Sequence, residues 1–262
     1  MHMRHAAFIL GTSVIAAALC SGCTSHEQAL RASATALKQN EYDQAIILAN
    51  DAMDKKLTSQ EAGEALYLRG RAYEQRPASS QGQLESNLQA ARNSYVEALR
   101  HSPSRRLNTY IHASLGKVAF FQDDFPTANQ QLWLAYGELD TPELKAAALY
   151  YMGKAQQRSG QFQDADQTFA NVSQRYPDTP WANKASTSRG VRAFYVQLAV
   201  YANPTSADTA IKAVQQRGIQ AARGTDNQGR FLLKAGPFGS YAQAKQARQR
   251  LQDLFGDAFV TP

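Results

Sequence analysis

The spacing of hydrophobic positions changes about three quarters of the way along the chain. Between residues 27 and 185, apolar and small residues recur every three or four positions, the period of amphipathic helices. From residue 194 the stretch "FYVQLAVY" alternates instead, and "GRFLLKAGPF" alternates again from residue 229. The pattern therefore predicts an all-helical segment followed by a small module that contains strands.

The helical segment repeats a pattern of small residues. In "ALYYMGKAQQRSGQFQDADQTFANVSQRYPDTP", Gly153 lies on one predicted helix and Ala165 twelve positions later on the next. The pair recurs in two further copies, the second with a longer loop: Gly116 with Ala128, and Gly70 with Ala91. An opening copy retains mainly its second half, "NEYDQAIILANDAM". One hairpin cannot bury its own apolar face, so we expect three or four to stack. An irregular helical bundle is the alternative.

The same helical segment contains four aromatic residues that are candidates for ligand binding. Trp133, Tyr136, Tyr150 and Tyr151 are candidates for a ligand groove, although aromatic residues at helical spacing more often belong to a core.

The C-terminal module has the predicted order βαββαβ. Its elements are a strand from residue 194, a helix capped by Ser206, the strands "IQAAR" and "GRFLLKA", a helix capped by Ser240 and the strand "DAFVT". Two helices cover only one face of a four-stranded antiparallel sheet. We therefore expect an α+β multidomain protein in which the other face of this sheet is open.

Alternation assigns residues to that open face, with the first and third strands central: Tyr195, Gln197, Ala199 and Tyr201 beside Arg230, Leu232 and Lys234. This set of side chains suits a carbohydrate. Aromatic rings stack on the apolar faces of pyranoses, amides bond hydroxyl and N-acetyl groups, and cations pair with carboxylates.

Two family resemblances are carried by these motifs. The helical copies resemble the tetratricopeptide repeat (TPR), and "FYVQLAVY", "GRFLLKAGPF" and "FGDAFV" resemble the SPOR (sporulation-related repeat) domain over residues 194–262. The SPOR resemblance implies binding to peptidoglycan, in particular to septal glycan strands from which amidases have removed the stem peptides. Gln197 stands at the recurrent glutamine of the family, and such strands expose lactyl carboxylates that would pair with the two cations. The predicted site therefore consists of Tyr195, Gln197, Tyr201, Arg230, Leu232 and Lys234. Ala199, Val200 and Leu232 depart from the family pattern, which has a Gly-Ser pair and a further cation.

The N-terminus has the features of an export signal. Arg4 precedes an apolar run from Ala6 to Leu19, which is too short to span a bilayer as a mature helix. The following "LCSGC" resembles a bacterial lipoprotein box, which implies a signal peptide over residues 1–22 and lipidation of Cys23. Thr24, rather than Asp, implies the outer membrane, with the chain facing the periplasm. A plain cleaved signal is the alternative, since Cys20 stands where the family prefers Leu.

Composition narrows the chemistry. The net charge of +6 over 262 residues is below the density typical of nucleic-acid binding. Both cysteines lie in the first 23 residues, and the histidines have no metal-ligand spacing. The acidic pairs Asp123–Asp124 and Asp164–Asp166 lie at predicted helix starts, where they favour the helix dipole. We expect no enzyme, no metal and no cofactor.

The sequence thus predicts a TPR-like stack over residues 23–185, a linker over 186–193 and a SPOR domain over 194–262. The leading hypothesis is an outer-membrane lipoprotein that binds denuded glycan strands, with repeats that recruit a division or wall-remodelling protein at the septum. The alternative is a scaffold that acts through its repeats with weak or no glycan binding. RNA binding, which also uses βαββαβ sheets, lacks the required aromatic spacing.

Overall fold

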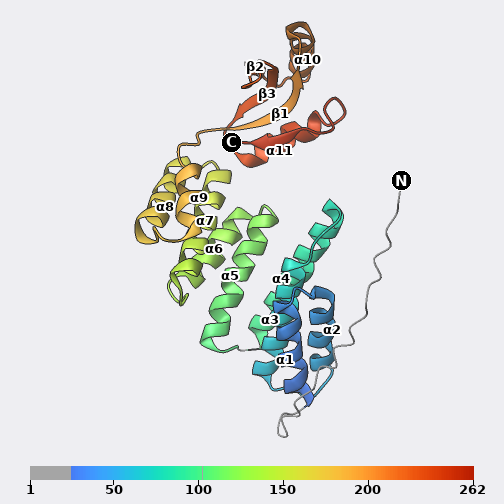
Figure 1. Ribbon diagram of the computed structural model, residues 1–262, viewed down its shortest axis with the longest axis vertical. Coiled ribbons are helices and arrows are strands. Elements are labelled where there is room, and N and C mark those ends of the chain that lie inside the picture. The colour runs from blue at the N-terminus through green and yellow to red at the C-terminus, as the bar shows by residue number, and fades with distance from the viewer. Residues whose placement is uncertain (1–24, 102) are drawn as a thin grey trace, which may run out of the picture.

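A computed structural model describes residues 25–101 and 103–262. The predicted signal peptide and Cys23 lie outside the described residues. The described chain is a stack of helices that continues into a strand-containing module at the end remote from the first helix (Figure 1).

The helices form four antiparallel hairpins and one closing helix. Their bounds are α1 Ser25–Lys38 and α2 Tyr42–Met53, α3 Ser59–Gln75 and α4 Gln81–Arg100, α5 Arg105–Phe121 and α6 Phe125–Tyr136, α7 Pro142–Arg158 and α8 Phe162–Arg175, then α9 Pro180–Ser188. The prediction that the opening copy keeps mainly its second half was wrong. Helix α1 is complete. It lacks the repeat glycine, because the equivalent position is Ser33, which is buried and donates to the carbonyl of Ala45 at 2.8 Å.

In three of the four hairpins, the repeat glycine makes room for a large side chain on the second helix. A Cβ atom built on Gly153 would lie 2.7 Å from the ring of Phe169, and one on Gly116 would lie 2.5 Å from Leu132. Gly70 faces Tyr95 in the same way. The predicted alanine partners of these glycines are buried as well, at 0% exposure. The packing of a large side chain of the second helix against a glycine of the first therefore keeps the two helices close together.

In three of the hairpins, a tight turn joins the two helices. Asn40, Asp123 and Gly160 occupy the same position of their hairpins, and their φ angles are 62°, 60° and 86°. Asn, Asp and Gly are the residues that adopt this left-handed conformation most readily, so each ends one helix and reverses the chain. The α3–α4 connection, whose extra residues were noted in the sequence, uses no such turn.

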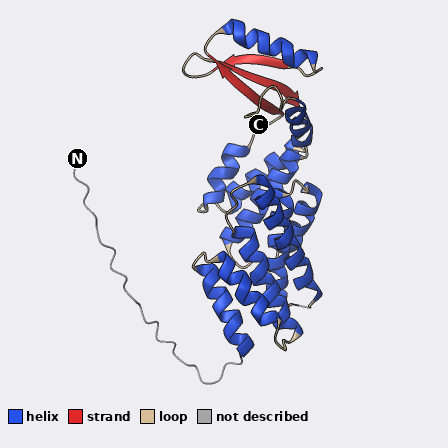
Figure 2. Ribbon diagram, turned by 90° about the vertical axis from the view of Figure 1, so that its right-hand side faces the viewer, coloured by secondary structure: helices blue, strands red, loops and turns tan. Residues whose placement is uncertain are grey.

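The C-terminal module has the predicted order of elements: β1 Phe194–Tyr201, α10 Pro204–Gln216, β2 Ala221–Thr225, β3 Phe231–Phe238, α11 Tyr241–Arg250 and β4 Phe259–Thr261. The strands form one sheet at the end of the helical stack (Figure 2). They are antiparallel in the order β2-β3-β1-β4, so the first and third strands are central as predicted. Val214 of α10 and Leu251 after α11 pack with Val196 and Leu233 in one core, which places both helices on the same face. The predicted fold class is confirmed.

The caps of the two C-terminal helices differ in how well they were predicted. Ser240 caps α11, as expected, by accepting a hydrogen bond from the Gln243 amide. Ser206 does not cap α10. Asn203 accepts from the amide of Ser206, and Pro204 takes the first helical position, where its missing N–H costs nothing.

The connection between repeats and module is short and anchored. Helix α9 runs to Ser188, so the non-helical connection is residues 189–193, not the predicted 186–193. Asp166 of α8 accepts from the Gly190 amide at 2.9 Å and pairs with Arg192 at 2.8 Å. A carboxylate on the last hairpin thus holds the connecting segment in place.

A second contact joins the helical stack to α11. The guanidinium of Arg158 lies 4.5 Å from the ring centre of Phe120 and 4.4 Å from that of Tyr241. Lys245 of α11 pairs with Asp123 at 2.6 Å. The side of the module that touches the repeats is therefore its helical side, and the open face of the sheet is left clear.

Candidate functional site

The open face of the sheet is built around one row of residues that crosses three strands. Gln197 of β1 lies opposite Lys234 of β3 on one side and opposite Phe259 of β4 on the other. Gln197 and Lys234 are half-buried, and Phe259 is 51% exposed. An amide, a cation and an aromatic ring therefore lie side by side on a surface that no helix of the module covers.

Tyr195 extends this row along β1. The Lys234 ammonium lies 5.7 Å from the centre of the Tyr195 ring, within the range of a cation–π contact. The ring lies against Gly236, where a Cβ atom would come within 3.1 Å of Tyr195 Cδ1. Gly236 also has φ +124°, a conformation that residues with side chains avoid, so a glycine is needed here both for the backbone and for the ring.

A bulge in β1 changes the face of the residues that follow it. The pairing with β3 shifts between Gln197 and Ala199, after which Ala199 lies opposite buried Leu233 and Tyr201 lies opposite Phe231. The prediction that Ala199 and Tyr201 share the open face was therefore wrong. Tyr201 packs against the core beneath the helices, and Val200, 41% exposed, takes its place beside Leu232. One extra residue in a strand reverses the alternation beyond it.

Arg230 lies in the turn before β3 and not within the sheet. Its Nε donates to Asp226 Oδ2 at 2.8 Å, and its backbone amide donates to Oδ1 of the same carboxylate. The backbone hydrogen bond from Arg230 and the guanidinium lower the pKa of Asp226. Arg230 therefore closes the β2–β3 turn with a partner of its own, and the structure does not join it to the row of Gln197 and Lys234.

Of the six predicted site residues, the open face brings together Tyr195, Gln197, Leu232 and Lys234. Phe259 was missed. Its signal was present in "DAFVT", since a strand placed beside β1 must present one of its alternating residues next to Gln197, and Phe259 is the large one.

The aromatic residues singled out in the repeats have different positions. Trp133 on α6 is 66% exposed. Tyr136 donates or accepts a hydrogen bond with Tyr176 at 2.9 Å. Tyr150 and Tyr151 pack at the margin of the core with Trp181. Tyr151 and Trp181 also line a cavity between the hairpins.

Three of the four residues of the acidic pairs make contacts that stabilise the fold. Asp124 caps α6 by accepting from the Thr127 amide, Asp123 binds Lys245, and Asp166 binds the connecting segment. Within residues 25–101 and 103–262, no group of three or more His, Cys, Asp or Glu side chains could hold a metal ion. In the same part of the chain, none of the helices has the length and apolar character needed to cross a membrane.

Comparison with known families gives one match in each part of the chain. The model of the SPOR domain matches residues 190–262, which contain the whole sheet and both of its helices. A tetratricopeptide-repeat model matches residues 147–179, the hairpin of α7 and α8. A comparison with curated proteins found no match. The chain thus contains a SPOR domain and, in the hairpin of α7 and α8, a tetratricopeptide repeat. SPOR domains bind peptidoglycan, and tetratricopeptide repeats mediate protein interactions; both are binding modules and not catalytic ones.

Proposed function

We propose that this protein is a non-enzymatic lipoprotein of the bacterial outer membrane that binds denuded septal glycan strands through the open face of its SPOR domain. Its repeats, over residues 23–185, recruit a protein of cell division or wall remodelling. The observation that carries the glycan proposal is the row of Lys234, Gln197 and Phe259 with Tyr195 beside it. Rings supply stacking surfaces for pyranoses, Gln197 supplies an amide for hydroxyl and N-acetyl groups, and Lys234 supplies a charge for lactyl carboxylates.

The direct test is co-sedimentation of the complete chain with purified sacculi, before and after treatment with an amidase that removes stem peptides. We expect binding to increase after treatment. Gln197→Ala and Lys234→Gln should each weaken binding, since each removes one contact worth about 1 kcal/mol, a factor of about five in affinity. Gln216→Ala and Lys212→Gln are matched controls, because both side chains are exposed on α10, on the other side of the sheet. Absence of binding to both preparations would remove the glycan proposal.

The scaffold alternative is favoured by one observation. With Arg230 paired to Asp226 and Val200 in place of Tyr201, the open face is more apolar and carries less free charge than the sequence predicted. If the repeats alone direct the protein, septal localisation of a fluorescent fusion survives removal of residues 194–262. If the glycan site directs it, the truncated fusion spreads around the envelope.

Lipidation is tested separately with a clickable fatty acid. We expect the complete chain to incorporate the label, Cys23→Ala to lose it and Cys20→Ala to keep it. Several acyl chains, at about 0.8 kcal/mol per buried methylene, hold a protein on a membrane almost irreversibly. Label that stays with Cys23→Ala would contradict the assignment.

A further inference from the structure

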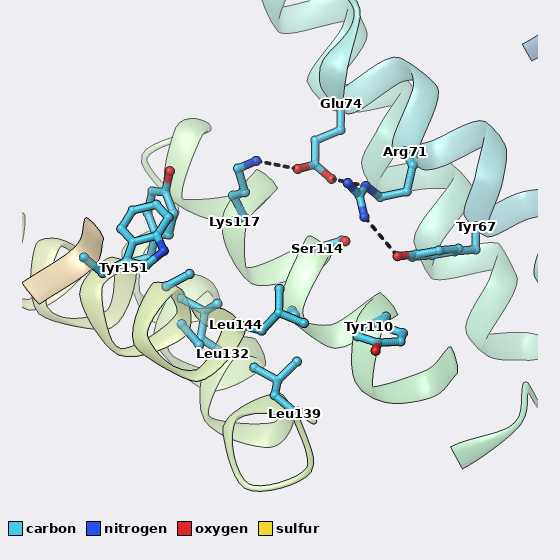
Figure 3. Close-up of a pocket in the computed structure, with 14 residues that line it drawn as sticks. Tyr67, Arg71, Glu74, Tyr110, Ser114, Lys117, Leu132, Leu139, Leu144 and Tyr151 are labelled. Carbon is cyan, nitrogen blue, oxygen red and sulfur yellow. Dashed lines mark hydrogen bonds and ion pairs between the residues drawn. The ribbon is translucent and has the colours of Figure 1, made fainter. Parts of the chain in front are cut away.

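The strongest unassigned feature is a cavity on the face where the first helices of successive hairpins meet. It has a volume of about 240 Å³ and is lined by α3, α5, the α6–α7 region, α7 and Trp181 of α9. Figure 3 shows Tyr67, Arg71 and Glu74 on one side of it and Leu132, Leu139, Leu144 and Tyr151 on the other. The cavity therefore has a polar wall from α3 and an apolar wall from the third and fourth hairpins.

The polar wall carries more positive than negative charge. Glu74 is only 4% exposed, and its carboxylate accepts from Lys117 at 2.8 Å and from the Tyr95 hydroxyl at 2.6 Å. Arg71 lies 3.8 Å from the same carboxylate and donates to the Tyr67 hydroxyl at 3.1 Å. Two cations thus share one carboxylate that is already engaged, and one positive charge is left over at the cavity.

Lys117 is the cation best placed to meet a ligand. It belongs to α5, the helix between the two walls, and its side chain is 38% exposed. An ammonium has three N–H donors, and the contact with Glu74 uses one of them. A partial desolvation of the site by Tyr151 and the leucines makes an added ion pair there stronger than one in open water.

The apolar wall calls for a bulky apolar group. Leu144 is 38% exposed at the start of α7, while Leu132 and Leu139 are almost fully buried at the base. The volume lies below the range of roughly 300–1,000 Å³ that is usual for complete small-molecule ligands. A cavity of this size takes one anchoring side chain of a larger partner in preference to a whole cofactor.

We propose that this cavity binds a peptide segment of a partner protein in which a carboxylate adjoins a bulky apolar side chain, the carboxylate meeting Lys117 and Arg71 and the apolar group packing on Leu144 and Tyr151. The inference deepens the proposed recruitment of a protein by the repeats and rests on it. Charge complementarity selects the occupant: an acidic segment satisfies the excess cation, whereas a basic or neutral one leaves it unsatisfied.

The test uses two fluorescein-labelled peptide libraries and fluorescence polarisation with the complete chain. Every member of the first library carries leucine, phenylalanine or tryptophan beside glutamate or aspartate. The second library is identical except that glutamine and asparagine replace the acids, and both libraries are amidated at the C-terminus. A third set with a free C-terminal carboxylate and no acidic side chain distinguishes a terminal carboxylate from a side-chain one. We expect carboxylate-bearing members to bind, more weakly as salt rises, and their amide counterparts to bind less.

Variants of the cavity have opposite expected effects, which a folding defect cannot imitate. Lys117→Gln should weaken the binding of acidic peptides about fivefold and leave the amide library unchanged. Glu74→Gln should strengthen acidic binding, because it removes the competing charge while its side chain still accepts from Tyr95. Leu144→Ala should weaken both libraries. Leu84→Ala, which truncates a leucine of similar exposure on α4, should change neither.

Three results would overturn the inference: equal binding of the acidic and amide libraries, binding of neither, or concentration-dependent dimers that Leu144→Ala abolishes, which would make a second copy the occupant. Sacculus co-sedimentation of the same preparations separates this inference from the proposed glycan function. Retained glycan binding with failed peptide binding removes only the cavity proposal.

Discussion

Two tyrosines on one strand, Tyr195 and Tyr201, provide the sharpest test of the open face. They lie six positions apart, so strict alternation would place both on the same side of the sheet. The bulge after Gln197 places Tyr195 beside Lys234 on the open face and Tyr201 against the core under the helices. Replacing each tyrosine with alanine should therefore have different consequences.

Tyr195→Ala removes a stacking surface and little of the core. Aromatic contacts contribute about 0.5–1.5 kcal/mol beyond the area that they bury, so glycan affinity should fall about fivefold. Stability should change by less than about 0.5 kcal/mol, as is usual for surface positions. Tyr201→Ala removes a ring that is partly buried. Complete burial would cost about 3–5 kcal/mol on truncation, and partial burial reduces this to about 1–3 kcal/mol, with glycan affinity of the folded protein unchanged.

The assay must report on the SPOR domain by itself. The chain has two tryptophans, Trp133 and Trp181, and both lie in the repeats, so tryptophan fluorescence does not detect unfolding of the sheet. Hydrogen exchange of amides in β1 and β3 measures the free energy of opening of the module directly. Co-sedimentation with amidase-treated sacculi gives the affinity of the same samples.

The reasoning would be refuted by the reverse assignment. If Tyr201→Ala weakens glycan binding while exchange in β1 and β3 stays slow, the face assignment of β1 is incorrect beyond Gln197. Equal loss of binding in both variants without loss of stability would show that both rings reach the ligand.

Three further predictions concern the repeats and their junction with the SPOR domain. Gly153→Ala should destabilise the repeats by about 1 kcal/mol, because the crowding of Phe169 outweighs the higher helix propensity of alanine; denaturant unfolding followed by tryptophan fluorescence measures this. Adding Phe169→Leu to the same chain should recover part of the lost stability. As a control, Gly63→Ala should be stabilising, since its Cβ atom would meet nothing closer than 3.4 Å. Arg158→Ala removes the cation between the Phe120 and Tyr241 rings. Small-angle scattering should then show a wider range of orientations between the repeats and the SPOR domain, while binding to sacculi is retained. An unchanged scattering profile would show that Arg158 does not hold the two parts together. Burial and the charge of Arg158 lower the pKa of Lys154 to about 8, whereas an unfolded lysine titrates near 10.4. Between these values the unfolded state binds more protons, so the free energy of unfolding should rise with pH by up to about 3 kcal/mol. Lys154→Gln should remove that rise, and an identical pH profile of stability in both proteins would argue against it.

The sequence by itself determined most of the elements and their order, with the first helix of the opening hairpin as the exception. Helices and strands have different periods, so the change of period after residue 185 was enough to separate the repeats from the SPOR domain. The twelve-residue spacing of Gly153 and Ala165 was enough to define a hairpin, because close helix contact demands small residues at fixed positions. The order βαββαβ was enough to make the first and third strands central.

Only the tertiary structure decided which side chains meet. The bulge in β1 arises from its pairing with β3, so the pattern within β1 alone does not predict that Tyr201 packs against the core. Phe259 joins Gln197 because β4 pairs at one particular register. Glu74 and Lys117 lie 43 positions apart and meet across two hairpins. Local periodicity shows which side chains of a segment face solvent and which are buried. Strand register and hairpin packing depend instead on contacts between segments that are distant in the sequence. Those contacts form both the open face and the cavity.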